Sequence, residues 1–217
     1  MTDKFILAIE TSIKSGSLSI SNCAGVIESW AGNNDISRSE DLIPQISRLL
    51  EKNQLRLDGL QKIAVSTGPG SFTGIRVGIA VAKGLAFALD RPLTGFSIFE
   101  ALVLADSLFQ AEIKAAIVSA GRDLYFWQIF QGMNPLNVAA TGNSVQLESA
   151  LGIYKVLRVI AEPIAFKSLS ENNFGFLSET LIINDNCAEL IGRCAASQCE
   201  EPEDVSPLYV RPAVILR

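Results

Sequence analysis

The sequence predicts an α/β fold, and three stretches lead to this prediction. Residues 5–9 form a continuous apolar run, as in a central strand that is buried on both faces. Residues 42–50 carry one apolar stripe at helical spacing, which is typical of a helix that lies on a sheet. Residues 72–89 form a longer helix that is apolar on almost every side. With 217 residues, of which 48% are apolar, the chain can bury a sizeable core in one or two domains.

Three further strands are predicted around the first helix. Residues 16–21 alternate apolar side chains with serines, as in a strand with one wet face. A turn between Asn22 and Gly25 then leads back into a third strand at residues 26–30. Residues 62–66 form the strand that precedes the long apolar helix.

The start of the first helix has two interpretations. Residues 37–40, Ser-Arg-Ser-Glu, have the order of a capping box, but Pro44 would then lie inside the helix. Alternatively the helix kinks at Pro44, or Asp41 is the N-cap and Pro44 lies in the first turn.

After residue 92 the pattern of strands and helices starts again. We therefore place a domain boundary near residue 98, between an N-terminal domain at 1–98 and a smaller one at 99–217. Residues 142–183 show no clear pattern. Elsewhere in the second domain we expect helices at residues 98–109 and 186–197 and strands at residues 114–119 and 124–131.

The composition excludes several kinds of chemistry. The chain contains no histidine, so Ser–His–Asp catalysis, Cys–His catalysis and HExxH zinc sites are excluded. Carboxylate, lysine and threonine chemistry remain open. The net charge is −5, and no Lys/Arg cluster is longer than two residues. If the protein acts on a nucleic acid, we therefore expect a partner to provide the basic surface that binds the phosphate backbone.

The cysteines and the apolar runs bear on the compartment. Cys23, Cys187, Cys194 and Cys199 form no CxxC pair, and we expect buried structural thiols rather than disulfides. We find no apolar run that approaches ~18 residues, and so expect no membrane span. The apolar stretch within residues 1–12 is too short for a signal peptide. Together these features predict a cytoplasmic protein without a membrane contact.

A glycine-rich turn opens the long apolar helix. Pro69 and Gly70 suit the central positions of a type II turn, and Ser71 suits the N-cap. Free N–H groups at such a helix start can hold an anion. However, the spacing does not match the Walker A motif, and Thr73 stands where GxGxxG requires its third glycine. The favoured interpretation is a tight strand-to-helix turn.

The long helix has more apolar surface than one sheet can cover. Arg76, Lys83 and Asp90 form its single polar line, which leaves an apolar arc of roughly 280° where about 100° would suffice. Either the helix is buried inside one domain or its second side contacts another chain, and we favour the contact. The residues expected at this partner interface are Ile75, Gly78, Ile79, Ala82, Leu85 and Ala86.

Four stretches resemble the TsaB (YeaZ) family of bacterial tRNA threonylcarbamoyladenosine biosynthesis proteins. They are IETS at 9–12, RSEDLIPQISRLL at 38–50, STGPGSFTGIRVGIAVAKGLAFA at 66–88 and PLYVR at 207–211. The resemblance is strong over residues 5–99 and weak over 100–200. The family-motif turn comprises Gly68, Pro69, Gly70, Ser71, Phe72, Thr73, Gly74 and Arg76.

The resemblance implies an actin-like (ASKHA, ribonuclease H-like) fold in two lobes, with the last ~15 residues packing back on the first lobe. It implies a non-catalytic scaffold that supports its paralogue TsaD, which modifies the adenosine next to the anticodon. It also implies pairing with TsaD through the first two helices, a further partner in the ATPase TsaE, and tRNA contact only through the complex. Without TsaD, the same surface is expected to form a homodimer.

The sequence departs from related enzymes at several positions. The HxxxH metal motif of TsaD cannot exist here, and no Gly-Gly pair is present. Glu10 matches the acidic residue of the first lobe, but the strand of the second lobe ends in Ser119-Ala120-Gly121. Arg38 replaces the usual histidine of the family. We assign no catalytic, cofactor or metal residue; the alternatives are a small actin-like phosphotransferase or a peptidase.

Overall fold

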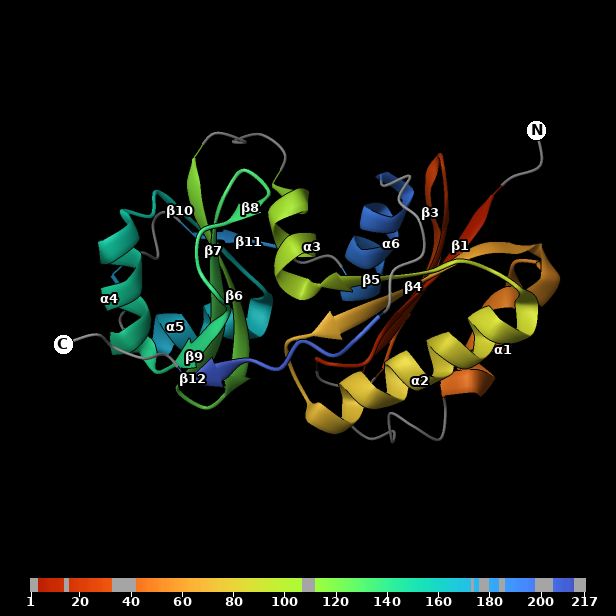
Figure 1. The fold of residues 1–217 in the computed structure, drawn as a ribbon, viewed down its shortest axis with the longest axis horizontal. Coiled ribbons are helices and arrows are strands. Elements are labelled where there is room, and N and C mark those ends of the chain that lie inside the picture. The colour runs from red at the N-terminus through yellow and green to blue at the C-terminus, as the bar shows by residue number, and fades with distance from the viewer. Residues whose placement is uncertain are drawn as a thin grey trace. The chain divides into compact units, whose positions relative to one another are not determined.

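The computed structural model describes residues 4–13, 16–32, 42–106, 112–172, 174–175, 180–183, 186–197 and 205–212. The chain divides into two compact units, each with its own β-sheet (Figure 1). Unit 1 comprises Met1–Ala101 and Asp185–Leu208, and unit 2 comprises Leu102–Asn184 and Tyr209–Arg217.

Unit 1 contains a five-stranded sheet in the order β3-β2-β1-β4-β5. The first three strands are antiparallel neighbours, and β4 and β5 join β1 in parallel. The strands are β1 (Phe5–Glu10), β2 (Ser17–Asn22), β3 (Gly25–Ala31), β4 (Leu60–Gly68) and β5 (Leu93–Ser97).

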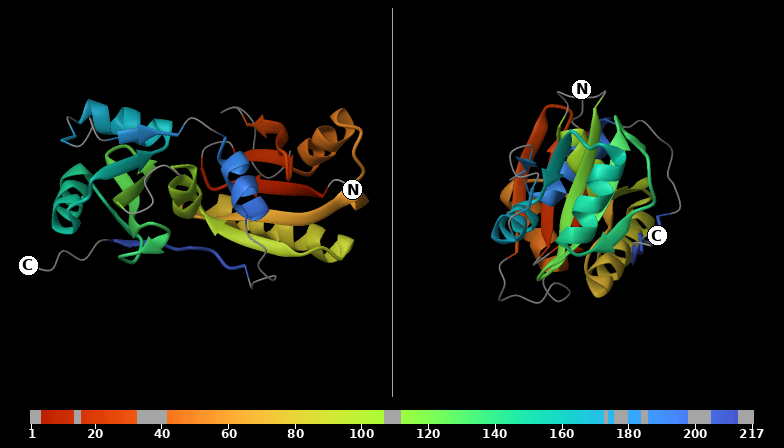
Figure 2. Two further views of the ribbon diagram at one scale, coloured as in Figure 1. Left: turned by 90° about the horizontal axis from the view of Figure 1, so that it is seen from above. Right: turned by 90° about the vertical axis from the view of Figure 1, so that its left-hand side faces the viewer.

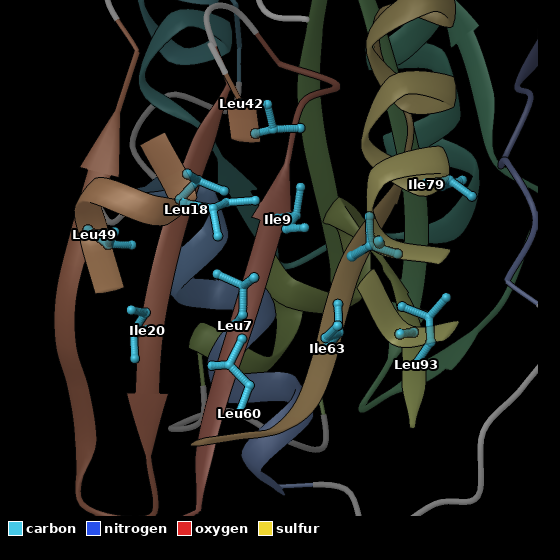
Figure 3. Packing of buried hydrophobic residues seen from close by; sticks show 14 of the residues in the cluster. Leu7, Ile9, Leu18, Ile20, Leu42, Leu49, Leu60, Ile63, Ile79 and Leu93 are labelled. Atoms are coloured by element: carbon cyan, nitrogen blue, oxygen red, sulfur yellow. The ribbon is translucent and has the colours of Figure 1, made fainter. Parts of the chain in front are cut away.

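The core of unit 1 lies under helices α1 and α2, on one face of this sheet. Figure 3 shows the side chains of β1 and β2 that point into this core. Burying each large aliphatic side chain there stabilises the fold by about 1.5–3 kcal/mol. The helices of unit 1 are α1 (Leu42–Lys52), α2 (Phe72–Leu89) and α6 (Cys187–Ser197), with a 3₁₀ turn η1 (Leu57–Gly59); α3 (Ile98–Ala105) crosses the division between the units.

Helix α6 covers the opposite face of the same sheet. Ser19 Oγ on β2 donates a hydrogen bond of 2.8 Å to the carbonyl oxygen of Ala188. A Cβ atom at Gly192 would lie 3.6 Å from Cβ of Ala8, which alternates with the core residues of β1. Serines on β2 and small residues on α6 therefore form the contact between α6 and the five-stranded sheet of unit 1, which we call sheet 1.

Unit 2 is built around a mixed sheet in the order β11-β10-β6-β7-β9-β12, with β8 paired to β7. Helix α4 lies over β7 and β9 (Figure 2). The elements are β6 (Ile113–Gly121), β7 (Leu124–Gln131), β8 (Asn134–Pro135), β9 (Ala140–Gly142), α4 (Ser144–Tyr154), β10 (Arg158–Ala161), α5 (Pro163–Glu171), β11 (Thr180–Ile182) and β12 (Arg211–Pro212).

The two units repeat one topology. In unit 1 the order is three antiparallel strands, a helix, a parallel strand, a helix and a second parallel strand. In unit 2 strands β6, β7, β9, β10 and β11 follow the same order and directions, with α4 and α5 in the places of α1 and α2. A βββαβαβ pattern therefore occurs twice in a chain in which we find no internal sequence repeat.

Most predicted elements are confirmed, and the differences have clear causes. The strand at 124–131 and the helix at 72–89 have the predicted bounds. Helix α1 begins at Leu42, so Pro44 lies in its first turn; residues 37–41 lie outside the described part of the chain. The tract 142–183, which shows no clear pattern in the sequence, contains α4, β10, α5 and β11; α4 is as long as α1, but it exposes Val145 and Ile153 while it buries Leu147 and Leu151, so its apolar residues form no single stripe.

The division of the chain differs from the expected one. The expected second domain is 99–217, with only the last ~15 residues packing back on the first. In the structure Asp185–Leu208 belongs to unit 1, while Tyr209–Arg217 belongs to unit 2. The reason is α6, whose apolar stripe marks a helix but does not specify the sheet that the stripe covers.

Of the cysteines that the structure describes, only one matches the expectation of a buried thiol. Cys194 is buried, Cys187 is half-buried and Cys23 is exposed, and none of these three is in a disulfide. Cys199 lies outside the described residues.

Candidate protein-binding surface

A buried carboxylate holds the end of strand β1. Glu10 is almost fully buried, and its Oε1 accepts hydrogen bonds from the backbone N–H groups of Ser12 and Ile13 and from Ser12 Oγ at 2.6 Å. Ser12 Oγ also lies 3.3 Å from Ser66 Oγ on β4. Glu10 therefore orders the loop after β1. Within the described ranges, no group of three or more Cys, Asp and Glu side chains is placed to hold a metal ion.

Two glycines let α2 approach this strand end closely. A Cβ atom at Gly70 would lie 2.2 Å from the carbonyl oxygen of Ser12, and one at Gly74 would lie 2.0 Å from that of Thr11. Two hydrogen bonds cross the contact: the Ser71 N–H donates to the Ser12 carbonyl, and Thr11 Oγ1 donates to the Gly74 carbonyl, both at 2.7 Å. The backbone of Thr11 and Ser12 thus occupies the space that side chains at positions 70 and 74 would need.

The glycine-rich turn forms a structural junction. The predicted N-cap is confirmed, because Ser71 Oγ accepts a hydrogen bond from the Gly74 N–H at 3.2 Å. The predicted type II turn is wrong: φ of Gly70 is +153°, whereas that turn needs about +80° at its second central residue. The N–H groups of Ser71, Gly74 and Ile75 all donate within the chain, which favours a junction over an anion site.

Five of the six residues expected at the partner interface face the chain's own sheet. Ile75, Ile79, Ala82 and Ala86 are buried in the core of unit 1, and a Cβ atom at Gly78 would lie 2.2 Å from Thr11 Oγ1. Leu85 is half-buried. The assignment of these residues to a partner contact is therefore corrected. Small residues on this stripe let the helix lie close to its own sheet, not to a second helix.

The opposite side of α2 is open and contains large apolar side chains. Phe87 is 92% exposed and Phe72 is 53% exposed. We define the outer face of α2 by the exposed residues Phe72, Arg76, Ala80, Lys83, Gly84 and Phe87.

This outer face combines aromatic, small and basic residues. The guanidinium of Arg76 lies over the Phe72 ring, 3.8 Å from its centroid, which orients both side chains at the start of the helix. Ala80 and Gly84 lie between the two phenylalanines, and a Cβ atom at Gly84 would meet no atom within 4 Å. A second helix can approach closely there, with an aromatic side chain at each end of the contact.

Helix α2 also corrects the expectation that no segment is suited to crossing a membrane. Phe72–Leu89 is long and apolar enough by length and composition, although one such helix is weak support for a span. Its buried side packs into the core of unit 1, as in a core helix of a globular domain.

The sequence contained a signal for the outer face that the interface assignment did not use. Arg76 and Lys83 mark the exposed direction of the helix, as the structure confirms. Ala80 and Phe87 lie within about 40° of Arg76 around the helix axis and share its exposure. Phe72, which the resemblance assigns to the family-motif turn, belongs to the outer face as well, because the polar line through Arg76 runs along the exposed side of the helix.

The repeated topology matches that of known proteins. One solved structure from Bacteroides thetaiotaomicron, described as having an actin-like ATPase fold, is similar over 89% of this chain and 97% of its own, with TM-score 0.50 and 9% identity. The structure of YeaZ from Pseudomonas aeruginosa is similar over 95% of this chain and 100% of its own, with TM-score 0.66 and 23% identity. The chain thus has the two-lobe, actin-like α/β fold.

Sequence comparison specifies the family within this class. The family model for tRNA N6-adenosine threonylcarbamoyltransferase (TsaD) matches residues 34–188, more than half of the chain. TsaB of Buchnera aphidicola subsp. Schizaphis graminum is 30% identical over 151 residues, 70% of each chain. TsaB of Haemophilus influenzae is 38% identical over 95 residues, 43% of this chain and 40% of its own. The chain belongs to the TsaB (YeaZ) family, which is related to TsaD.

The matched region is limited in extent. For three curated TsaB relatives, including that of Haemophilus influenzae, the chain spans 40–57% of the relative's length.

Proposed function

We propose that this protein is a non-catalytic scaffold in the synthesis of tRNA threonylcarbamoyladenosine, and that the outer face of α2 is its docking surface. The observation that carries the proposal is the exposure of Phe87 and Phe72 on a helix whose other side is already buried. Large exposed apolar side chains gathered on one helix face mark a protein contact. The names of the TsaB relatives supply the process.

The partner that fits best is TsaD, the paralogue whose family model matches this chain. A related fold can present a helix equivalent to α2, and two such helices can pack through their small residues. Without TsaD, the same face pairs with a second copy. TsaE is the further partner of the complex. The protein contacts tRNA only as part of this complex, in the cytoplasm.

Two alternatives are less well supported by the residues. A phosphotransferase of this class needs an acid at the end of β6, where Ser119 is found. The N–H of Ser119 donates to the nearby Glu162 carboxylate at 3.1 Å, and that carboxylate also caps α5. A peptidase that uses a Ser–Lys pair needs a buried lysine as its base; among the described residues the buried lysine is Lys114, and it contacts Asp106 instead. We therefore expect no turnover of ATP or casein by the purified protein.

The experiment is co-purification with TsaD and sizing of the isolated protein. Phe87→Glu places a charge on the outer face and should abolish both TsaD capture and self-association while the circular dichroism spectrum is unchanged. The matched control is Val138→Glu in unit 2, where Val138 is 86% exposed. If Phe87→Glu still captures TsaD as the control does, the outer face of α2 is not the docking surface.

A further inference from the structure

The outer face of α2 presents its side chains in a palindromic order. Along the helix it contains the exposed residues Phe72, Arg76, Ala80, Lys83 and Phe87. With about 3.6 residues per turn, these five lie within an arc of about 80° around the helix axis, so they form one stripe. An aromatic residue lies at each end of the stripe, a cation comes next from either end, and a small residue lies near the middle.

The palindrome determines what the stripe meets when two copies of this chain pair through it. In an antiparallel pair of α2 helices with its two-fold axis near Ala80, Phe72 opposes Phe87 of the second copy. Arg76 then opposes Lys83 of the second copy, because both lie equally far from the axis. In a parallel pair each residue opposes its own counterpart. Both arrangements bring aromatic side chains together, which is favourable, and cations together, which is unfavourable.

Sliding one helix along the other exchanges this conflict for another. A slide of two turns in the antiparallel pair brings Arg76 opposite Asp90 of the second copy, but it also brings the two Lys83 side chains together. Phe72 then lies beyond Leu89, where the opposing helix ends, so the aromatic contacts are lost. A second copy therefore cannot satisfy the aromatic and the charged positions of the stripe at the same time.

The repulsion between opposed cations acts at the distance of a helix contact. Packed helices lie about 8–10 Å apart, which is close to the Debye length of about 10 Å at about 0.1 M salt. The guanidinium of Arg76 lies over the Phe72 ring, 3.8 Å from its centroid, so it cannot turn away from the contact without leaving the ring. A partner with negative charge at the opposing positions replaces this repulsion by attraction.

We propose that Arg76 and Lys83 select the partner of α2, and that they favour a helix with an acidic face over a second copy of this chain. This inference rests on the proposed function, in which the outer face of α2 is the docking surface. The two cations are seven residues apart, which is about two turns of one helix face. The favoured helix therefore carries two carboxylates with the same spacing and a small residue between them, where it meets Ala80.

The selection works through the wrong pairing as much as through the right one. The homodimer gains its aromatic contacts against the repulsion of opposed cations, so it is weak. The acidic partner keeps the contacts with Phe72 and Phe87 and adds two ion pairs at Arg76 and Lys83. For TsaD, the proposed partner, this predicts that its docking helix presents carboxylates at these two positions.

The experiment converts this chain into a mimic of the acidic partner. The double variant Arg76→Glu with Lys83→Glu has two carboxylates on the stripe and keeps both phenylalanines. A mixture of the wild type and this variant opposes cations to carboxylates in the antiparallel and in the parallel pair alike. Sedimentation with one protein labelled should give a Kd for the mixed dimer at least about tenfold below that of either homodimer at low salt. About 0.5 M salt should remove most of this preference.

The control has the same net charge but an unchanged outer face. It combines Lys155→Glu with Lys167→Glu, at two exposed positions of unit 2. Its mixture with the wild type should show no preference for the mixed dimer. Circular dichroism should show that all the variants are folded. The control should capture TsaD as the wild type does, whereas Arg76→Glu with Lys83→Glu should capture it at least about tenfold more weakly.

Two results separate this inference from the proposed function. If Phe87→Glu abolishes TsaD capture but the mixed dimer is no tighter than the homodimers, the docking surface stands and the selection by charge is refuted. If Phe87→Glu still captures TsaD, the docking surface itself is wrong, and the selection by charge is refuted with it.

Discussion

Thr11 Oγ1 donates a hydrogen bond of 2.7 Å to the carbonyl oxygen of Gly74, while the Thr11 carbonyl oxygen lies 2.0 Å from where a Cβ atom of residue 74 would be. These two residues hold the start of α2 against the end of β1. The obstructing atom belongs to backbone, so it cannot rotate away as the end of a flexible side chain could.

The substitution Gly74→Ala tests this contact. It should lower the free energy of unfolding by about 1–3 kcal/mol, because the methyl group forces α2 away from β1. Gly84→Ala on the same helix is the control: its methyl group meets nothing, and it should raise stability by up to about 1 kcal/mol. Urea unfolding measures both, and equal effects would contradict the close approach.

Ala82 and Ala80 distinguish the two sides of α2. Ala82→Arg puts a long charged side chain into the core of unit 1 and should cost more than about 4 kcal/mol, enough to prevent folding. Ala80→Arg changes the exposed side and should keep the fold while preventing association. Circular dichroism and sizing chromatography check the pair. A folded Ala82→Arg protein would show that Ala82 does not face the core of unit 1.

A buried ion cluster in unit 2 should be sensitive to loss of one charge. Asp106 Oδ2 lies 3.2 Å from Lys114 Nζ and 2.9 Å from Arg158 Nε; the contact with Arg158 is an ion pair without hydrogen-bond geometry. Lys114→Met should cost about 1–3 kcal/mol, because the buried carboxylate loses one of its two cations and keeps only Arg158. The double variant with Asp106→Leu should recover part of the loss. The control is Lys167→Met, which urea unfolding should place within about 0.5 kcal/mol of the wild type. If Lys114→Met leaves the free energy of unfolding unchanged, the ion cluster does not stabilise unit 2.

Stability should fall at high pH because of Cys194. Burial, with a contribution from the charge of Glu100, raises the pKa of the Cys194 thiol from 9.0 to about 12. Above pH 9 the unfolded chain loses this proton and the folded chain keeps it, so the contribution is complete below pH 9 and is lost toward pH 12. The loss by pH 10.5 is up to about 2 kcal/mol.

Urea unfolding at pH 8 and pH 10.5 checks the contribution of Cys194. Cys194→Ala removes this titration but keeps all the others, so the variant should lose less stability than the wild type does. The same loss in both proteins would contradict the pKa shift.

The isolated protein should bind tRNA weakly. Because the net charge is −5, we expect a Kd in the non-specific range of ~10⁻⁴ to 10⁻⁶ M at physiological salt. Filter binding measures it. A sub-micromolar Kd at that salt would mean that the chain itself recognises tRNA.

The sequence predicted elements well where burial follows a regular period. Strand β7 and helix α2 have their predicted bounds, because alternation along a strand and a capped start of a helix are local features. The repeated βββαβαβ topology could not be predicted from residue patterns. Strand order depends on pairing between distant segments, and two units can have the same topology without similar sequences. The return of α6 to sheet 1 was hidden for the same reason.

The two sides of α2 show what the sequence determines and what the tertiary structure decides. The sequence alone determined that the helix begins after Ser71, is apolar on almost every side and has one polar line through Arg76. An arc of roughly 280° contains many stripes of the 100° width that a sheet can cover. Only the tertiary structure selected one of them, the stripe through Gly78 and Ala82, because small residues there let the helix come close to Thr11, and this choice left Phe87 exposed.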